Sequence, residues 1–284
     1  MDAFNFEVVA TRVRVDCPDR AIVDLLHTTY GHLATDDGNR ADLRYSITEV
    51  DSGVYRVESH SDPNDDFPQD RSRSIAGRGG LLALLDDYLV VSLQLAHPEL
   101  YFLHAAVVSW KGSGFVLPAT TGSGKSTFAW ALLSHGFEYV SDELAPLSLD
   151  PPSVVPFPRA LCLKQEPPPD YKISTAALTT ERSIHIPPTA LPLYNEPGSL
   201  PVAAIIFPKY RSEGQDPSPR RISPGRAATR IYENCLNALS HSGLGLDAAT
   251  SLATQLPCYE ISTRELRAAC GSVHHLAEEL VDEL

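Results

Sequence analysis

The chain has 284 residues, of which 43% are hydrophobic, so it can fill one large globular core or two small ones. Its net charge of −13 repels the phosphate backbone of nucleic acids, and we therefore expect no nucleic-acid partner. Its five cysteines contain no C-x-x-C pair, which argues against a disulfide framework and against a zinc site.

The first residues lack the basic region and apolar core of a signal peptide. The apolar stretch over residues 81–96 is interrupted by Asp86 and Asp87, so the sequence predicts no membrane-spanning segment and no membrane partner. We expect a reduced, cytoplasmic protein.

Residues 1–98 are expected to form a small α+β module. Alternating polarity predicts a strand over residues 6–15, and Pro18-Asp19 opens an amphipathic helix that runs to Tyr30. Strands are expected over residues 43–50 and 54–57, joined by a hairpin turn and followed by an exposed loop over residues 59–73. A long apolar helix over residues 81–96 ends at His97-Pro98, where we place the domain boundary.

Residues 99–284 are expected to form a second, α/β domain. Strands over residues 101–108 and 115–117 form a hairpin, and a helix that ends at Gly136 leads to a strand over residues 137–143. Prolines crowd residues 151–201 and predict short edge strands and loops. We expect a buried strand over residues 202–207, helices over 224–239 and 246–256, a strand over 258–262, and a final helix from Arg264.

Residues 119–127 read Ala-Thr-Thr-Gly-Ser-Gly-Lys-Ser-Thr, which is the A/G-x-x-x-x-G-K-S/T pattern of a phosphate-binding loop. An apolar strand precedes this phosphate loop and a helical pattern follows it, as the motif requires. Lys125 would reach the β- and γ-phosphates of a nucleoside triphosphate, and Ser126 would ligate Mg²⁺. The expected nucleotide-binding residues are Thr121, Gly122, Ser123, Gly124, Lys125, Ser126 and Thr127.

A carboxylate pair, Asp142-Glu143, follows Lys125 by 17 residues (142 − 125) on the next strand. GTPases and motor ATPases place their acidic residue much further on. Beside a γ-phosphate, one carboxylate can orient the metal and the other can accept a proton from an attacking hydroxyl. We interpret the pair as functional; the alternative is that it begins a loop.

His104 lies in an apolar strand, Leu103-His104-Ala105-Ala106. A lone histidine of this kind is often a satisfied core residue. The small neighbours, however, leave room for a phosphate or a carboxylate beside it, and we keep a catalytic role open.

The histidine strand, the phosphate loop and Ser141-Asp142-Glu143, in this order and spacing, resemble the bacterial HPr kinase/phosphorylase family. More closely, the chain is similar to the HPr-kinase-related proteins associated with peptide-modification gene clusters, which carry blocks like residues 156–164, 185–188 and 207–210. The glycine-rich acidic signature of the true HPr kinases is not found downstream of the pair. We therefore do not extend the resemblance to HPr as the acceptor, to the reverse reaction or to hexameric assembly.

The resemblance implies a fold: an α/β phosphate-loop kinase core of the HPr kinase and phosphoenolpyruvate carboxykinase type over residues 99–284. It implies Mg²⁺- and ATP-dependent phosphorylation of a serine hydroxyl on a peptide or protein. Asp142 becomes the candidate base, Asp142 and Glu143 become metal contacts with Ser126, and His104 is expected near the transferred phosphate. Arg159 and Lys164 are expected to neutralise phosphate charge.

Three alternatives stay open from the residues alone: a small-molecule hydroxyl kinase, a nucleotide-dependent ATPase or switch without an acceptor, and a degenerate kinase that only binds. The proline-rich segment could lie over the cleft as an acceptor surface or could be an ordinary connection. The oligomeric state is not determined, and a homo-oligomer is among the options.

Overall fold

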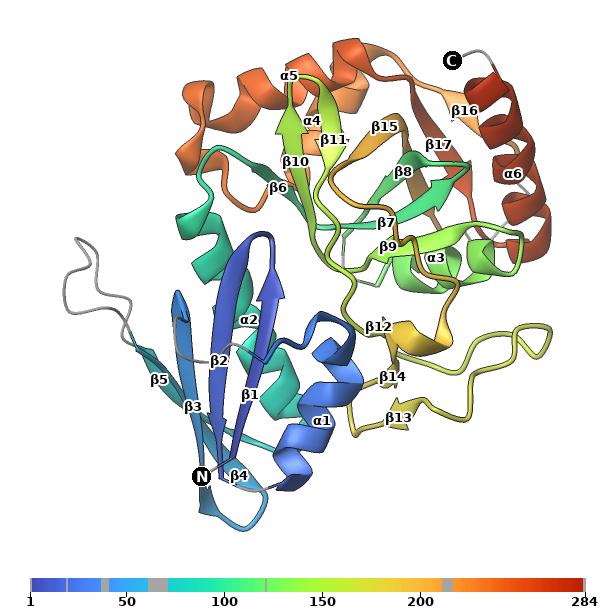
Figure 1. Ribbon diagram of the computed structural model, residues 1–284. Coiled ribbons are helices and arrows are strands. Elements are labelled where there is room, and N and C mark those ends of the chain that lie inside the picture. Colours follow the sequence, from blue (N-terminus) through green and yellow to red (C-terminus); the bar gives the residue numbers. More distant parts are fainter. Residues whose placement is uncertain are drawn as a thin grey trace.

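The computed structural model describes residues 2–18, 20–36, 41–60, 71–120, 122–210 and 217–282. They form a mixed α/β structure with three sheets, as the sequence predicted (Figure 1). The N-terminal strands occupy one part of the molecule, and the strands and helices after residue 100 occupy the other.

The N-terminal sheet has five strands in sequence order: β1 (Asp2–Val8), β2 (Thr11–Cys17), β3 (Leu43–Asp51), β4 (Val54–His60) and β5 (Arg71–Ala76). Helix α1 (Arg20–Tyr30) connects β2 to the parallel strand β3, and the short helix η1 (Gly31–Leu33) follows α1. Helix α2 (Arg78–Ala96) joins α1 and the sheet in one hydrophobic core. The core forms because alternate strand residues, such as Val13 and Val15, are buried.

Two expectations for this part are wrong. Residues 6–15 form two antiparallel strands rather than one, since the chain reverses at Val9 and Ala10, which have φ values of 48° and 52°. Neither residue type signals such a turn, which normally uses Asn and Gly. The loop expected over residues 59–73 is also shorter, because His60 belongs to β4 and Arg71 begins β5; residues 61–70 lie outside the described residues.

Helix α2 begins at Arg78, three residues before the predicted start. By length and composition it is apolar enough to cross a membrane, and half of that apolar window is buried inside the protein. The buried residues pack in the N-terminal core, which accounts for the apolar composition without a bilayer.

The large sheet has the strand order β6-β10-β11-β15-β8-β7-β9, with β17 beside β15 and β16 beside β17. Its strands are β6 (Tyr101–Leu103), β7 (Ala105–Trp110), β8 (Ser113–Pro118), β9 (Glu138–Ser141), β10 (Ala145–Leu149), β11 (Pro152–Val154), β15 (Leu200–Lys209), β16 (Arg220–Arg221) and β17 (Cys258–Ser262). Strand β15 runs parallel to β8 and to β17. The predicted hairpin of β7 and β8 is present.

Helices cover both faces of this sheet. Helices α3 (Lys125–Leu133) and α6 (Leu266–Asp282) pack on one face, and α4 (Pro224–Glu233) and α5 (Leu246–Gln255) pack on the other (Figure 1). Neighbouring residues of one strand face opposite layers: Ile205 packs with α4 and α5, whereas Ile206 packs with α3 and α6. This two-sided burial explains the continuous apolar runs of β8 and β15.

The proline-rich segment forms short strands and loops, as predicted. Strands β12 (Leu161–Leu163), β13 (Leu178–Thr179) and β14 (Ile184–Ile186) make a small sheet, and helix η2 (Pro188–Ala190) follows. One strand of this segment is not an edge strand, because β11 lies between β10 and β15.

Two further boundaries differ from expectation. The strand predicted over residues 101–108 is broken at His104 into β6 and β7, which pair with different neighbours. The helix predicted over residues 224–239 ends at Glu233, and the short helices η3 (Ala238–Ser240) and η4 (Ser242–Gly245) follow. The domain boundary at residue 98 stays a prediction; Phe102, Leu144 and Phe157 pack into the N-terminal core.

The turn between β1 and β2 yields a stability prediction. Ala10 is exposed with a left-handed φ of 52°, which disfavours any residue with a Cβ. We expect Ala10→Gly to raise the free energy of unfolding by about 0.5–1 kcal/mol in urea titrations, because glycine relieves this strain. The matched control, Ala34→Gly at a φ of −59°, should lower it. A less stable Ala10→Gly variant would contradict the strained turn.

Candidate active site

The large sheet brings the phosphate loop and the carboxylate pair to the same edge. Strands β8 and β9 both pair antiparallel with β7, so they run in the same direction and their carboxyl ends meet at one edge. The phosphate loop follows β8, and Asp142-Glu143 follows β9. Ligands in open α/β sheets commonly bind at this edge.

The backbone of the phosphate loop is shaped as its glycines predict. Gly122 and Gly124 have φ values of 84° and 86°, which residues with a Cβ rarely adopt. Lys125 then begins α3, so the free N–H groups of this helix point out of its first turn. Thr121, one of the predicted nucleotide-binding residues, lies outside the described residues.

A cavity of about 230 Å³ lies over the loop. The hydroxyl of Ser123 is buried there without a hydrogen-bond partner among the described residues, although buried hydroxyls are normally paired. An anion in the cavity would supply that partner. The described residues that line it are His104, Thr120, Gly122, Ser123, Gly124, Lys125, Ser126, Thr127, Glu143, Cys162, Lys164 and Gln165.

The ammonium of Lys125 is buried, with its Nζ atom 2.9 Å from Asp142 Oδ1 and 3.5 Å from Glu143 Oε1. The side chains of Lys125 and Asp142 are 4% and 0% exposed. Burial lowers the pKa of Lys125, but the charges of Asp142 and Glu143 outweigh that effect, and the pKa is raised from its ordinary value. Lys125 is therefore held as a cation at the start of α3.

The Asp142 carboxylate accepts three hydrogen bonds inside the protein. Its Oδ1 atom accepts from Lys125 Nζ and, at 3.1 Å, from the Ser126 hydroxyl; its Oδ2 atom lies 3.4 Å from the amide of Cys162. The predicted metal residues Ser126 and Asp142 are thus in direct contact. A hydroxyl and a carboxylate side by side suit Mg²⁺, which takes few protein ligands and keeps several waters.

Glu143 is the carboxylate that faces the cavity. Its backbone φ of 71° is unusual for a residue with a long side chain, and the side chain is 34% exposed. Its Oε2 atom lies 2.7 Å from Nε2 of His104. Burial raises the pKa of Glu143, but the His104 hydrogen bond and the Lys125 charge exceed that effect and hold the pKa well below its usual range.

His104 is fixed by its position between β6 and β7. Its amide donates to the carbonyl of Asn234 at 2.8 Å, and its carbonyl accepts from the amide of Ala119 at 3.4 Å. The strand break therefore ties the histidine to the first residue of the phosphate loop. His104 lines the cavity, and its ring is satisfied there by the hydrogen bond with Glu143, so its catalytic role stays a prediction.

Two predicted phosphate-neutralising residues differ in location. Lys164 lines the cavity. Arg159 is not among the lining residues; it is buried and its Nη2 atom lies 2.6 Å from Asp86 of α2. The charge of Arg159 still contributes to the lowered pKa of Glu143.

Three residues that sequence reasoning did not select also line the cavity: Thr120, Cys162 and Gln165. The Cys162 sulfur lies 3.3 Å from Nδ1 of His185, but burial raises the pKa of Cys162 to about 12 and lowers that of His185 to about 4. The pair is therefore neutral and is not an activated nucleophile. Only the position of β12 beside the loop brings Cys162 here, and no sequence spacing signals it.

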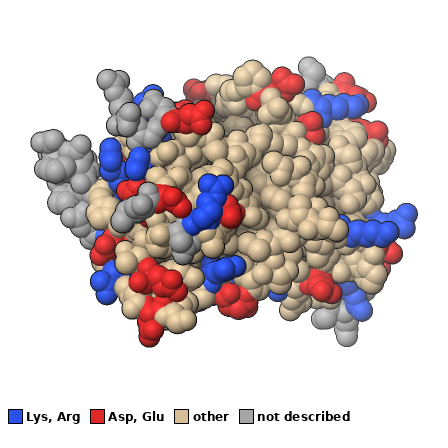
Figure 2. Space-filling view, turned by 60° about the horizontal axis from the view of Figure 1, so that its bottom comes forward, with Lys and Arg blue, Asp and Glu red and all other residues tan. Residues whose placement is uncertain are grey.

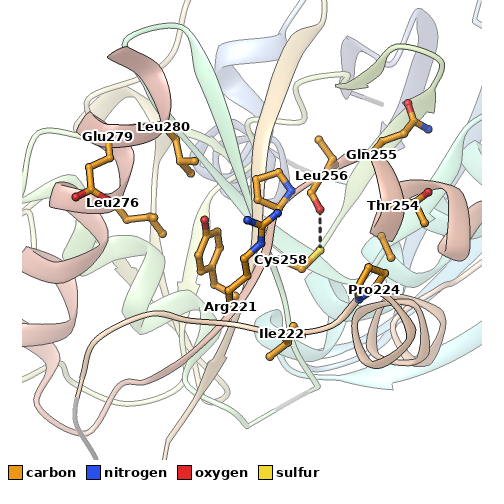
Figure 3. Close-up of a pocket in the computed structure, with 13 residues that line it drawn as sticks. Arg221, Ile222, Pro224, Thr254, Gln255, Leu256, Cys258, Leu276, Glu279 and Leu280 are labelled. Carbon is orange, nitrogen blue, oxygen red and sulfur yellow. Dashed lines mark hydrogen bonds between the residues drawn. The ribbon is translucent and has the colours of Figure 1, made fainter. Parts of the chain in front are cut away.

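A larger cavity, of about 460 Å³, lies at the other end of the sheet (Figure 3). Arg221 lies there between Leu276, Glu279 and Leu280 of α6 on one side and the end of α5 on the other. Cys258, which also lines it, begins β17, so this cavity is at the amino end of the parallel strands. The described residues that line it include no glycine loop and no carboxylate pair, so the smaller cavity is the better candidate for an active site.

The surface carries charges of both signs. On the face in Figure 2, Lys and Arg are interspersed with Asp and Glu, and a broad uncharged area lies between them. The expectations that nucleic acid and membranes are not partners stay predictions.

No family model matches this chain, and no curated protein matches it. Among solved structures, the chain is similar to the HPr(Ser) kinase/phosphatase from Coxiella burnetii, with 15% sequence identity and a TM-score of 0.31. The match covers 63% of this chain and 98% of that chain.

The Glu143–His104 contact generates a pH prediction. The folded-state pKa of Glu143 lies below its ordinary value of 4.5, so the ionised carboxylate stabilises the fold above that pH. We expect the difference in free energy of unfolding between the wild type and Glu143→Gln to be largest near neutral pH and to shrink as the pH falls below 4.5.

Urea titrations at a series of pH values measure this difference. In a His104→Ala background the pH dependence should weaken, because Glu143 loses its hydrogen-bond partner. A difference that stays constant down to pH 3 would show that Glu143 has no stabilising partner in the fold.

Proposed function

We propose that this protein is an ATP-dependent phosphotransferase that moves the γ-phosphate to a serine hydroxyl of a peptide or protein. The observation that carries the proposal is the shared cavity. Lys125 begins α3 beside its glycine turn, and the Glu143–His104 pair faces the same space. A phosphate-binding end and a proton-accepting pair meet there.

The nucleotide end of the cavity fits a triphosphate. The unpaired Ser123 hydroxyl, the first amides of α3 and the ammonium of Lys125 all offer donors to phosphate oxygens. Mg·ATP, when bound, supplies the transferable phosphoryl group. Its phosphates would contact Lys125, and its Mg²⁺ would contact Ser126. Asp142 holds both side chains in place from behind.

The acceptor end is formed by Glu143 and His104. The Glu143 carboxylate can accept the proton that leaves the acceptor hydroxyl as the new oxygen–phosphorus bond forms, and His104 Nε2, which donates a hydrogen bond to Glu143 Oε2, holds the carboxylate in position. From the sequence alone, Asp142 was the candidate base. Because Glu143 lines the cavity whereas the Asp142 side chain is fully buried beside Lys125 and Ser126, the geometry favours Glu143 for the proton and Asp142 for the metal.

The size of the cavity supports a macromolecular acceptor. Sites that enclose whole small molecules usually have volumes of about 300–1,000 Å³, and this one has about 230 Å³. A space of this size fits the triphosphate end of a nucleotide. The hydroxyl is therefore expected to enter from outside, on an exposed chain that passes Lys164 and Gln165.

The catalytic prediction concerns three isosteric variants. Glu143→Gln should lower kcat by about 10²–10⁴-fold with little change in ATP affinity, because the proton acceptor is lost. Asp142→Asn should lower activity and raise the Mg²⁺ concentration needed for half-maximal activity, because its metal contact is lost. Glu138→Gln, a carboxylate on β9 that contacts Ser109, is the matched control and should behave as wild type.

The measurement uses Mg²⁺, γ-labelled ATP and serine peptides, including a peptide encoded next to this gene. Label on serine supports the kinase; label only in free phosphate would instead indicate an ATPase or switch, and label on a small hydroxyl compound would indicate a metabolite kinase. Full activity in Glu143→Gln together with none in Asp142→Asn would show that Asp142, and not Glu143, accepts the proton. ATP binding without turnover would indicate a degenerate kinase.

A further inference from the structure

A buried ion pair joins the N-terminal part of the protein to the segment beside the site. Asp86 of α2 and Arg159, two residues before β12, approach to 2.6 Å between Oδ2 and Nη2. Their side chains are 15% and 6% exposed. Neither residue lines the cavity, and the reaction proposed above does not use Asp86.

The N-terminal end of this connection is anchored by helix α1. The Tyr30 hydroxyl donates a hydrogen bond to Asp86 Oδ1, and the carbonyl of Thr29 accepts from the amide of Ala160 at 2.8 Å. Burial lowers the pKa of Arg159, but the Asp86 carboxylate reverses the effect and holds the pKa well above its usual range. Arg159 is therefore charged and bound to its N-terminal partner.

The other end of the connection reaches the carboxylates. The Arg159 guanidinium donates to the sulfur of Cys162 at 3.4 Å, and the Arg159 carbonyl accepts from the Tyr139 hydroxyl at 2.8 Å. The amide of Cys162 in turn lies 3.4 Å from Asp142 Oδ2. A continuous line of polar contacts thus runs from Tyr30 to Asp142.

We propose that Asp86 and Arg159 are positioning residues: the N-terminal part of the protein holds residues 159–162 through this ion pair, and the Cys162 amide thereby orients Asp142. The catalytic readout of this proposal rests on the phosphotransferase function proposed above. The ion pair acts on the site through the backbone of the segment, without touching substrate.

The physical reason lies in the cost of a buried guanidinium. Without Asp86, Arg159 would be an uncompensated buried charge, and its field already reaches the carboxylates of Glu143 and Asp87. The segment would shift toward them, and the Cys162 amide would move with it. A buried ion pair of this kind adds little net stability compared with apolar side chains of the same size. Its contribution is therefore to hold residues 159–162 in one orientation.

The test compares Asp86→Asn with Asp87→Asn, the neighbouring carboxylate on α2, which lies in the field of Arg159 but, among the described contacts, forms no ion pair with it. Hydrogen exchange is measured on peptides that cover residues 157–165, and kcat and KM for ATP are measured with the serine acceptor. We expect Asp86→Asn to speed exchange in this segment and to lower kcat by about 10–100-fold, the usual effect of losing an outer partner, with KM for ATP nearly unchanged.

Asp87→Asn should leave the exchange and kcat as in the wild type. The double variant Asp86→Asn/Arg159→Gln should exchange no faster than Asp86→Asn alone, because it leaves no uncompensated guanidinium in the interior. If Asp86→Asn does not fold, Arg159→Lys is measured instead; it keeps the charge but loses the planar fork, and should change exchange and kcat in the same directions.

Unchanged exchange in both Asp86→Asn and Arg159→Lys would overturn the proposal, whatever the activity. An equal loss in Asp87→Asn would also overturn it, since that result indicates general destabilisation of α2. If the wild-type protein transfers no phosphate but Asp86→Asn still exchanges faster over residues 157–165, the exchange result supports the connection. The missing transfer then refutes the kinase function separately.

Discussion

The ion pair between Lys125 and Asp142 is the interaction on which the rest of the site depends. A buried ammonium is costly without a carboxylate partner, and this pair joins the first residue of α3 to the end of β9. The pair is possible because β7 lies between β8 and β9 and pairs antiparallel with both, so both strands end at one edge. The sheet order thus produces the contact, and the contact positions the phosphate loop against the carboxylates.

The two adjacent carboxylates have different surroundings and therefore different chemistry. Asp142 is fully buried among donors, whereas Glu143 turns through a left-handed backbone toward the cavity and His104. Residues next to each other in the chain thus point in different directions. In the reaction proposed above, one would hold a cation in place and the other would receive a proton.

Most elements of the fold could be predicted from local patterns, because their apolar periodicity is strong. The hairpin of β7 and β8, the helices α2, α5 and α6, and the buried strand β15 all occur where the sequence indicated them. The failures have local causes. Val9 and Ala10 form a tight turn that their residue types disfavour, and His104 breaks an apolar run because its backbone pairs with Asn234 instead.

The sequence by itself determined the phosphate loop, since Gly122, Gly124 and Lys125 carry their backbone and charge requirements in their residue types. It also determined that a carboxylate pair follows at short range. Only the tertiary structure decided which carboxylate meets His104, that Cys162 borders the cavity, and that Arg159 pairs with Asp86. These contacts join strands and helices far apart in the chain, and no local spacing encodes the packing that brings them together.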